Sequence, residues 1–149
     1  MNDNHFMELA IEQARLAKEA GEWPFGAVIV QGEKVIAQNR RTEAEEQNVL
    51  GHAELNVIDD ACKFLKTNEL SDCMIYCSNE PCLMCSSAIF QAKIPRVVIA
   101  ISRSDLPHLL RKRKLRIEDL ATDIGYEVEI VHGVSKEEAL ELFKDIRKA

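Results

Sequence analysis

Hydrophobic and polar positions alternate along the chain with two different periods, which predict helices and strands in turn. Apolar residues that recur every three or four positions are typical of a helix with one buried face, and short apolar runs between polar turns are typical of buried strands. The last helix is expected to begin with a capping box in which Ser135 pairs with Glu138. The predicted helices are 4–20, 52–65, 81–93, the polar and basic region 104–122, and the segment that follows Ser135; the predicted strands are 26–30, 34–37, 73–77, 96–101 and 126–131; residues 39–48 are a predicted polar loop.

Strands connected through helices indicate an α/β fold with parallel strand pairs and helices on both faces of the sheet. The first two strands are separated only by the turn Gln31–Glu33, so they form a hairpin and make the sheet mixed. We therefore expect a three-layer α-β-α sandwich around a five-stranded mixed sheet. The 149 residues contain no linker or repeat, and they are expected to form one domain over 1–149.

The charge of the chain argues against a protein built mainly to grip nucleic acid. Nineteen Lys and Arg residues stand against 25 Asp and Glu residues, which leaves a net charge of −6, whereas nucleic-acid-binding domains are usually basic. The run Arg111–Arg116 is a local exception, and such runs are most often solvated helix faces.

Membrane insertion and secretion are not expected. No apolar run approaches the roughly 20 residues that a membrane-spanning helix needs. The start, Met1–His5, has neither the basic region nor the apolar stretch of a signal peptide. We expect a cytoplasmic protein.

The chain has five cysteines, at positions 62, 73, 77, 82 and 85. An odd number without a secretory signal favours reduced thiols, metal ligation or redox chemistry over structural disulfides. Cys62, Cys73 and Cys77 lie on apolar stripes of predicted elements, where cysteine usually serves as a small buried hydrophobic residue.

Two short segments, His52–Glu54 and Pro81–Cys85, carry the candidate chemistry. Catalytic zinc takes three protein ligands of sulfur or imidazole nitrogen and keeps one position open. Cys82 and Cys85 are three residues apart at the start of a predicted helix and therefore project to the same side. His52, Cys82 and Cys85 are the candidate ligands of a Zn²⁺ ion.

Glu54 is the candidate catalytic residue. In a regular helix His52 and Glu54 would point roughly 200° apart, so they can converge only at a helix N-terminus, where the pattern places them. A carboxylate beside a metal-bound water, but not itself a ligand, can take the proton of that water and pass it on.

The pair H-x-E and P-C-x-x-C is the signature of zinc nucleobase deaminases, and the sequence resembles the cytidine/deoxycytidylate deaminase superfamily. The similarity covers about residues 5–102. Pro24–Val30, Leu70–Tyr76 and Glu80–Cys85 are similar to bacterial guanine deaminases and tRNA adenosine deaminases, while His52–Asn56 resembles deoxycytidylate deaminase and Ile94–Val98 fungal cytosine deaminase.

The resemblance implies roles for individual residues. It implies zinc ligation by His52, Cys82 and Cys85 and acid–base chemistry by Glu54. It also implies that the amide of Ala53 contacts the substrate base and that the carbonyl of Glu80 accepts a hydrogen bond from the leaving amine. Phe25 is a candidate for stacking on the base, although an aromatic residue beside a strand is more often part of the core. A homodimer is implied by the same resemblance.

The sequence departs from the family pattern on the substrate side. An asparagine that touches the substrate usually lies eleven residues before the zinc histidine, where this chain has Arg41, and Asn39 lies two positions earlier. A shift of the loop by two residues would make Asn39 the substrate contact. The usual Asp-Pro-Thr-Ala before the histidine is replaced by Asn48–Gly51.

Three other functions are weighed against a small-molecule deaminase. A thioredoxin-like redox site would use the two cysteines but not His52 or Glu54, and a non-catalytic zinc module would need a fourth ligand such as Cys73 or Cys77. A tRNA adenosine deaminase, which makes inosine, would use Arg111–Arg116 to hold phosphates. The acidic chain and the lack of a Gly/Ala-rich segment after residue 102 place this function second. The first expectation is a deaminase of a free nucleobase or nucleoside that releases ammonia, with guanine first and cytosine, adenine derivatives and deoxycytidylate open.

Overall fold

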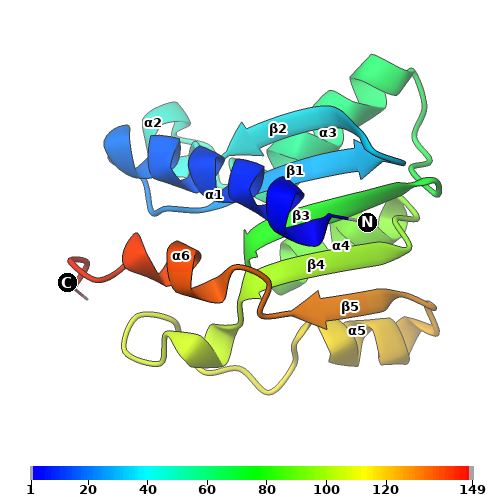
Figure 1. The fold of residues 1–149 in the computed structure, drawn as a ribbon. Coiled ribbons are helices and arrows are strands. Elements are labelled where there is room, and N and C mark those ends of the chain that lie inside the picture. Colours follow the sequence, from blue (N-terminus) through cyan, green and yellow to red (C-terminus); the bar gives the residue numbers. More distant parts are fainter. Residues whose placement is uncertain (1, 148–149) are drawn as a thin grey trace.

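The computed structural model describes residues 2–147 and contains one five-stranded mixed sheet with the strand order β2-β1-β3-β4-β5 (Figure 1). Strand β1 runs antiparallel to both of its neighbours, and β3, β4 and β5 run parallel to one another. The strands are β1 (Gly26–Gln31), β2 (Lys34–Arg40), β3 (Cys73–Asn79), β4 (Arg96–Ile101) and β5 (Glu129–His132); the helices are α1 (Asp3–Glu19), α2 (Glu43–Glu46), α3 (Ala53–Leu65), α4 (Leu83–Gln91), the 3₁₀ helix η1 (Arg103–Asp105), α5 (Ile117–Ile124) and α6 (Lys136–Glu141).

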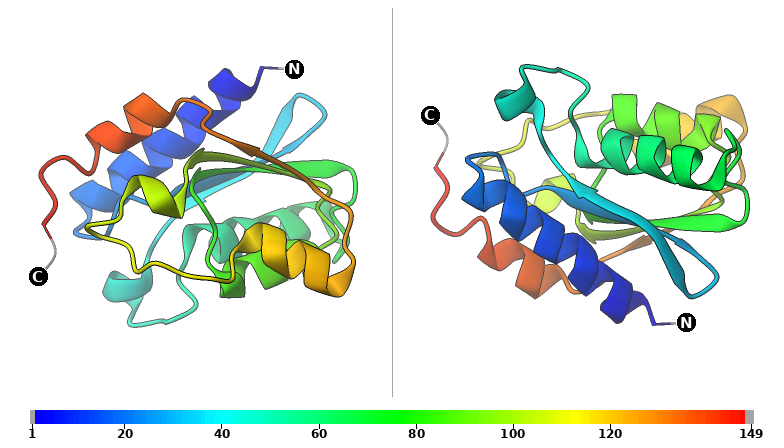
Figure 2. Two further views of the ribbon diagram at one scale, coloured as in Figure 1. Left: turned by 90° about the horizontal axis from the view of Figure 1, so that it is seen from below. Right: turned by 90° about the horizontal axis from the view of Figure 1, so that it is seen from above.

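Helices cover both faces of the sheet, so the predicted three-layer sandwich is confirmed. Helices α1 and α6 lie on one face and α3, α4 and α5 on the other (Figure 2). Each interface has its own apolar core, one built around Ile29, Ile75 and Ile99 and the other around Val28, Tyr76 and Val98. Neighbouring residues of a strand point to opposite faces, and therefore the central strands are hydrophobic throughout.

Helix α1 packs closely on the first strand because small residues line the contact. Ala10, Ala14 and Ala17 are fully buried. A Cβ atom at Gly26 would lie 2.2 Å from the carbonyl oxygen of Ala10 and 2.5 Å from the amide nitrogen of Ala14. Gly26 is therefore required for the distance between this helix and the sheet.

The predicted helix over 104–122 is wrong in its first two-thirds. Only η1 and α5 are helical, and residues 106–116 form an irregular segment. Pro107 removes a backbone donor, and the like charges of Arg111–Arg116 would repel one another at helical spacing.

Smaller differences concern the ends of elements. Helix α4 begins after Pro81 with Cys82 as its N-cap, and the last strand begins at Glu129, three residues later than expected. The predicted loop 39–48 contains the end of β2 and the short helix α2.

The capping box predicted at Ser135 is absent. Ser135 has a left-handed backbone with φ of 54°, and its side chain makes no capping hydrogen bond to α6. Its hydroxyl instead donates to Oδ1 of Asn4, which connects α6 to the start of α1. Within residues 2–147, no helix has the length and apolar character that crossing a membrane requires.

Candidate zinc and catalytic site

Two helix N-termini meet at the carboxyl end of β3. His52 is the N-cap of α3 and Cys82 is the N-cap of α4, and both have extended backbones that turn the chain into the helix. Strand β3 leads into α4 through Glu80 and Pro81. Clefts at the carboxyl ends of parallel strands are the usual position for sites in α/β folds. The fold thus brings together residues that are 30 positions apart in the sequence.

His52, Cys82 and Cys85 form the expected cluster. The Nδ1 atom of His52 lies 3.7 Å from Sγ of Cys82 and 3.4 Å from Sγ of Cys85. The three potential ligand atoms all lie within 4.8 Å of one another. One imidazole nitrogen and two sulfurs fit the three-ligand set of a catalytic zinc ion and leave a fourth position for water or substrate.

The electrostatics of the cluster prepare it for a cation. A hydrogen bond from Cys85, together with the contact to His52, lowers the pKa of Cys82 to about 4. The same hydrogen bond to Cys82, together with burial, raises the pKa of Cys85. The neighbouring Cys82 raises the pKa of His52. The site therefore already favours a thiolate, the form that binds zinc.

Glu54 lies in the first turn of α3 and is 7% exposed. Burial, with a contribution from the charge of Cys82, raises the pKa of Glu54 to about 7. A group with a pKa near the working pH exchanges protons readily in both directions, which suits an acid–base role.

The other cysteines do not belong to the cluster. Cys73 and Cys77 are buried in β3, as expected for small hydrophobic residues. Burial raises the pKa of Cys73 to about 11 and that of Cys77 well above its usual value. Cys62 is half-buried against the same core.

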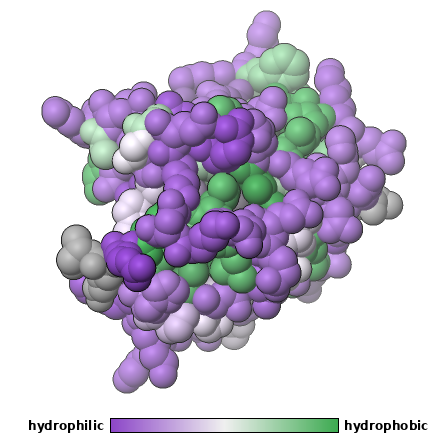
Figure 3. Space-filling view, turned by 60° about the vertical axis from the view of Figure 1, so that its left-hand side comes forward, coloured by the Kyte–Doolittle hydropathy of each residue, from purple (hydrophilic) through white to green (hydrophobic). Residues whose placement is uncertain are grey.

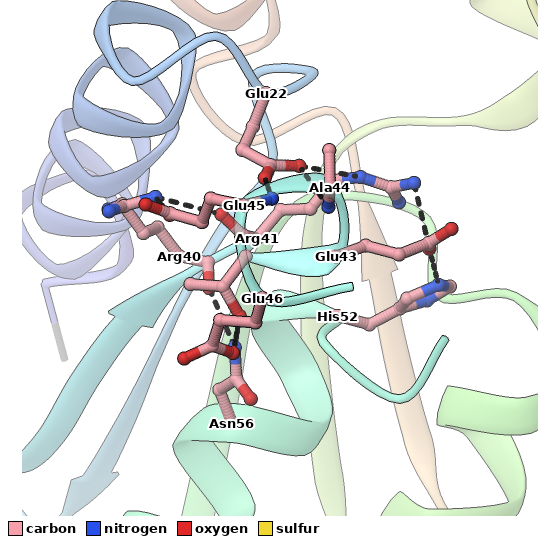
Figure 4. Close-up of polar contacts among 10 residues, drawn as sticks. Glu22, Arg40, Arg41, Glu43, Ala44, Glu45, Glu46, His52 and Asn56 are labelled. Atoms are coloured by element: carbon pink, nitrogen blue, oxygen red, sulfur yellow. Dashed lines mark hydrogen bonds and ion pairs between the residues drawn. The ribbon is translucent and has the colours of Figure 1, made fainter. Parts of the chain in front are cut away.

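A series of charged residues contacts the Nε2 side of the His52 ring, opposite the Nδ1 atom that faces the two thiols (Figure 4). Oε2 of Glu43 lies 2.8 Å from Nε2 of His52. Nη2 of Arg41 donates to the same oxygen at 2.8 Å, and Nε of Arg41 lies 3.7 Å from Oε1 of Glu22. The buried carboxylate of Glu22 also accepts hydrogen bonds from the amides of Ala44 and Glu45 at the start of α2. A carboxylate on Nε2 fixes the proton there and leaves Nδ1 free as a ligand.

Glu43 could not be identified from the sequence, because nothing in the spacing of motifs distinguishes it from its neighbours. Its position depends on closure of the segment between β2 and α3. The amide of Thr42 donates to the carbonyl of Gly51 at 2.8 Å. A Cβ atom at Gly51 would lie 2.9 Å from the amide nitrogen of Glu43, so a glycine permits this approach.

Arg41, and not Asn39, belongs to the polar network beside His52. The side-chain Nδ2 of Asn39 donates to Oδ2 of Asp60 on α3 at 2.7 Å. The side-chain Oδ1 of Asn39 accepts a hydrogen bond from the backbone amide of Arg40. The guanidinium carbon of Arg41 lies 5.4 Å from the centre of the Phe25 ring. Phe25 also packs on Trp23 and Phe143, as a core residue does.

Ala53 and Glu80 border the cluster. Ala53 is fully buried at the first position of α3. The side chain of Glu80 is also buried, and its carboxylate accepts hydrogen bonds from Arg116 and from the amide of Arg103. Figure 3 shows this end of the molecule, where hydrophobic residues lie recessed among hydrophilic ones.

Several known proteins are similar to this chain in sequence and structure. The tRNA-specific adenosine deaminase of Bacillus subtilis is 33% identical, with 98% of this chain and 91% of that protein aligned. The guanine deaminase of B. subtilis is 38% identical over 70% of this chain and 68% of that protein. A solved structure from a study of A-to-I editing by tRNA:A34 deaminases is 32% identical, has a TM-score of 0.79, and is matched over 93% of this chain and 98% of that one.

A family model described as MafB19-like deaminase matches residues 1–138. The match includes both helix N-termini and the complete nitrogen and sulfur cluster. The chain therefore belongs to the MafB19-like deaminases of the cytidine/deoxycytidylate deaminase superfamily, and it is a zinc-type deaminase, a hydrolase of C–N bonds.

Proposed function

We propose that this deaminase converts adenosine in tRNA to inosine and releases ammonia. The observation that carries the proposal is the near-complete alignment with the B. subtilis tRNA-specific adenosine deaminase, which covers 98% of this chain. From the sequence alone we expect guanine first and tRNA second, whereas the alignments with tRNA-specific adenosine deaminases support tRNA as the first candidate. Adenosine and guanine both present an exocyclic amine on a purine ring, so the chemistry at the cluster is the same for either.

The proposed reaction adds water to the amine-bearing carbon and expels ammonia, which leaves a carbonyl on the ring. His52, Cys82 and Cys85 would hold the zinc ion, which lowers the pKa of a bound water to about 7 when it is present. Glu54 would take a proton from the water and give it to the adjacent ring nitrogen. It would then take the proton of the hydroxyl group now on the carbon and deliver it to the departing amine, so that a carbonyl forms as ammonia leaves.

Two backbone groups complete the proposed site. The amide of Ala53, at the N-terminus of α3, is proposed to donate to the base, where the helix dipole also favours an acceptor. The backbone carbonyl of Glu80 is proposed to accept from the leaving amine. Arg41 lies where the family has its substrate-contacting asparagine, and we propose that Arg41 borders the base in place of Asn39. Phe25 is retained as a candidate stacking residue on the same side of the site.

Guanine deamination is the second candidate. The specific observation in its favour is the 38% identity to the B. subtilis guanine deaminase, which is confined to 70% of the chain. Cytosine, adenine derivatives and deoxycytidylate rank after guanine as candidate substrates.

A substrate panel tests the proposal. Zinc-loaded protein is incubated separately with tRNA, adenosine, guanine, cytosine and deoxycytidylate, and both ammonia and the deaminated base are quantified. A preparation of the Glu54→Gln variant serves as the blank for contaminating deaminases. The proposal expects inosine in tRNA as the main product. Turnover of guanine without inosine formation in tRNA would contradict it.

The assignment of residues 1–149 to a single domain stays a prediction. The homodimer also stays a prediction, because the structure describes one chain. Sedimentation equilibrium is expected to give twice the mass of one chain. A monomer at micromolar concentration would contradict the homodimer.

A further inference from the structure

The segment Arg103–Arg116 lies beside the zinc cluster and is fixed there at both of its ends. The amide of Arg103 donates to Oε1 of Glu80 at 3.1 Å, and Nε of Arg116 donates to Oε2 of the same carboxylate at 2.9 Å. Glu80 precedes the ligand Cys82 by two residues and its side chain is 1% exposed. Leu106 and Leu109 anchor the middle of the segment in the core. The segment therefore has a defined position relative to the cluster.

This segment borders a partly open cavity of about 380 Å³ whose lining combines cationic residues with the apolar Pro107 and Leu110. Arg103, Lys112, Arg113 and Arg116 line it together with the hydroxyl-bearing Ser104. None of the described residues that line the cavity is acidic. Glu80 neutralises Arg116 from outside the lining, but among residues 2–147 no salt bridge involves Arg103, Lys112 or Arg113.

The concentration of positive charge is unusual for this protein. The chain as a whole carries a net charge of −6 and has 25 acidic residues available as partners. Burial, with a contribution from the charge of Arg113, lowers the pKa of Arg103. A merely solvated helix face would place its cations apart in water, whereas these converge on one cavity.

The cavity is linked to the zinc cluster through Glu80. The amide of Arg103 and the guanidinium of Arg116, two residues that line the cavity, both donate to this carboxylate, which lies two positions before the ligand Cys82. On the other side of the segment, Lys112 and Arg113 share a second hollow with Leu83, the residue that follows Cys82. A nucleotide carries its phosphate one sugar away from the base, so a base at the zinc ion would bring a phosphate toward these cations.

We propose that the cavity formed by Arg103, Lys112, Arg113 and Arg116 binds a phosphate group of the substrate, so that the enzyme selects a base carried by a phosphorylated ribose over a free base. Arginine forms paired hydrogen bonds with phosphate oxygens, and lysine supplies a compact charge. The inference rests on the proposed deaminase site, but it does not depend on which purine is the substrate. The phosphate comes either from a mononucleotide or from the backbone of RNA.

The test compares two double variants that each remove two positive charges. Lys112→Gln/Arg113→Gln alters the cavity, and Lys63→Gln/Lys144→Gln removes two exposed lysines elsewhere. The substrates are adenosine, AMP and an RNA hairpin with an adenosine in its loop. Steady-state kinetics give kcat/KM for each, and fluorescence anisotropy gives the affinity of a labelled hairpin, with AMP and adenosine as competitors.

The proposal expects kcat/KM for at least one phosphate-bearing substrate to fall about tenfold in the cavity variant and not in the control. A loss with AMP identifies a mononucleotide phosphate. A loss with the hairpin alone, accompanied by a decrease of about 2 in the slope of log affinity against log salt, identifies the RNA backbone. Equal affinities and equal kcat/KM for the two double variants would overturn the proposal, and so would equal use of adenosine and its phosphate-bearing forms.

Base preference is measured separately with GMP and guanosine. If the guanine compounds are deaminated and the adenine compounds are not, the proposed function fails. The phosphate site would still be supported provided that GMP, but not guanosine, depends on Lys112 and Arg113.

Discussion

The carboxylate of Glu43 lies 2.8 Å from Nε2 of His52, on the side of the ring opposite the two thiols. Arg41 holds this carboxylate and is itself close to the buried Glu22. A carboxylate behind a ligand histidine fixes its tautomer and orientation and increases its basicity. Glu43 therefore acts on the metal site without being a ligand.

Replacement of Glu43 is expected to weaken zinc binding. Glu43→Ala removes the acceptor on Nε2, and we expect zinc affinity to fall by about 10–100-fold. Affinity is measured by competition with a chromogenic chelator. Glu45→Ala is the matched control, because it removes an ion pair with Arg40 from the same short helix without touching His52. Equal zinc affinity in the two variants would show that the contact with His52 has no effect on the metal.

The close approach of Gly51 to the backbone of Glu43 provides a second test of the contact between Glu43 and His52. Gly51→Ala would place a Cβ atom 2.9 Å from both the amide nitrogen of Glu43 and the hydroxyl of Thr42. The start of α2 must then move, and we expect zinc affinity to decrease several-fold through the loss of the Glu43 contact.

Gly32→Ala is the control for Gly51→Ala. Gly32 has φ of +63° in the hairpin turn and open space around it, so alanine strains the backbone by about 1–2 kcal/mol far from the site. Urea unfolding should therefore detect this variant while zinc affinity stays at the wild-type value. Unchanged zinc affinity in the Gly51 variant would contradict the role of loop closure.

The acid stability of the protein should depend on Asp3. The Asp3 carboxylate accepts two hydrogen bonds from Arg96 at 2.9 Å and one from the Tyr76 hydroxyl at 2.6 Å. The hydrogen bonds from Arg96 lower the pKa of Asp3. The resulting stabilisation is complete above the usual pKa of an aspartate and is lost as the pH falls through the lower pKa of the folded state.

Asp3→Asn is thus expected to lower the free energy of unfolding by about 1–2 kcal/mol at pH 7, and by less as the pH falls below 4. Urea titrations at several pH values measure both effects. Asp59→Asn, which breaks an exposed pair with Lys63, is expected to cost less than about 0.5 kcal/mol. A constant difference between wild type and Asp3→Asn from pH 7 to pH 3 would contradict the ionic origin of the effect.

Local patterns predicted the layers of the fold, whereas the residues of the metal cluster were predicted from the ligand preference of zinc together with the resemblance of His52–Glu54 and Pro81–Cys85 to the deaminase signature. The apolar stripe of α3 and the apolar run of β3 specify an element and its buried face, and the spacing of Cys82 and Cys85 specifies a shared direction. The same reasoning failed for residues 106–116. There the composition suggests a helix, but Glu80 and the core hold the segment in an irregular conformation.

The polar network of Glu43, Arg41 and Glu22 that contacts His52 could not be predicted, because it depends on contacts between residues that are distant in the sequence. Glu43 meets His52 only after the segment between β2 and α3 closes through Thr42 and Gly51. Glu22 meets Arg41 only after α1 packs on the sheet. None of these pairs has a spacing that a helix or strand would impose.

The most direct test of the account is the Glu54→Gln variant, measured for zinc content and for deamination in one preparation. The variant keeps the size of the side chain in its buried position but cannot carry the proton. We predict one zinc ion per chain, as in the wild type, and a decrease in kcat of about 10²–10⁴-fold. Loss of the zinc ion would make Glu54 a ligand, and wild-type turnover would remove it from the reaction; either result would contradict the central claim.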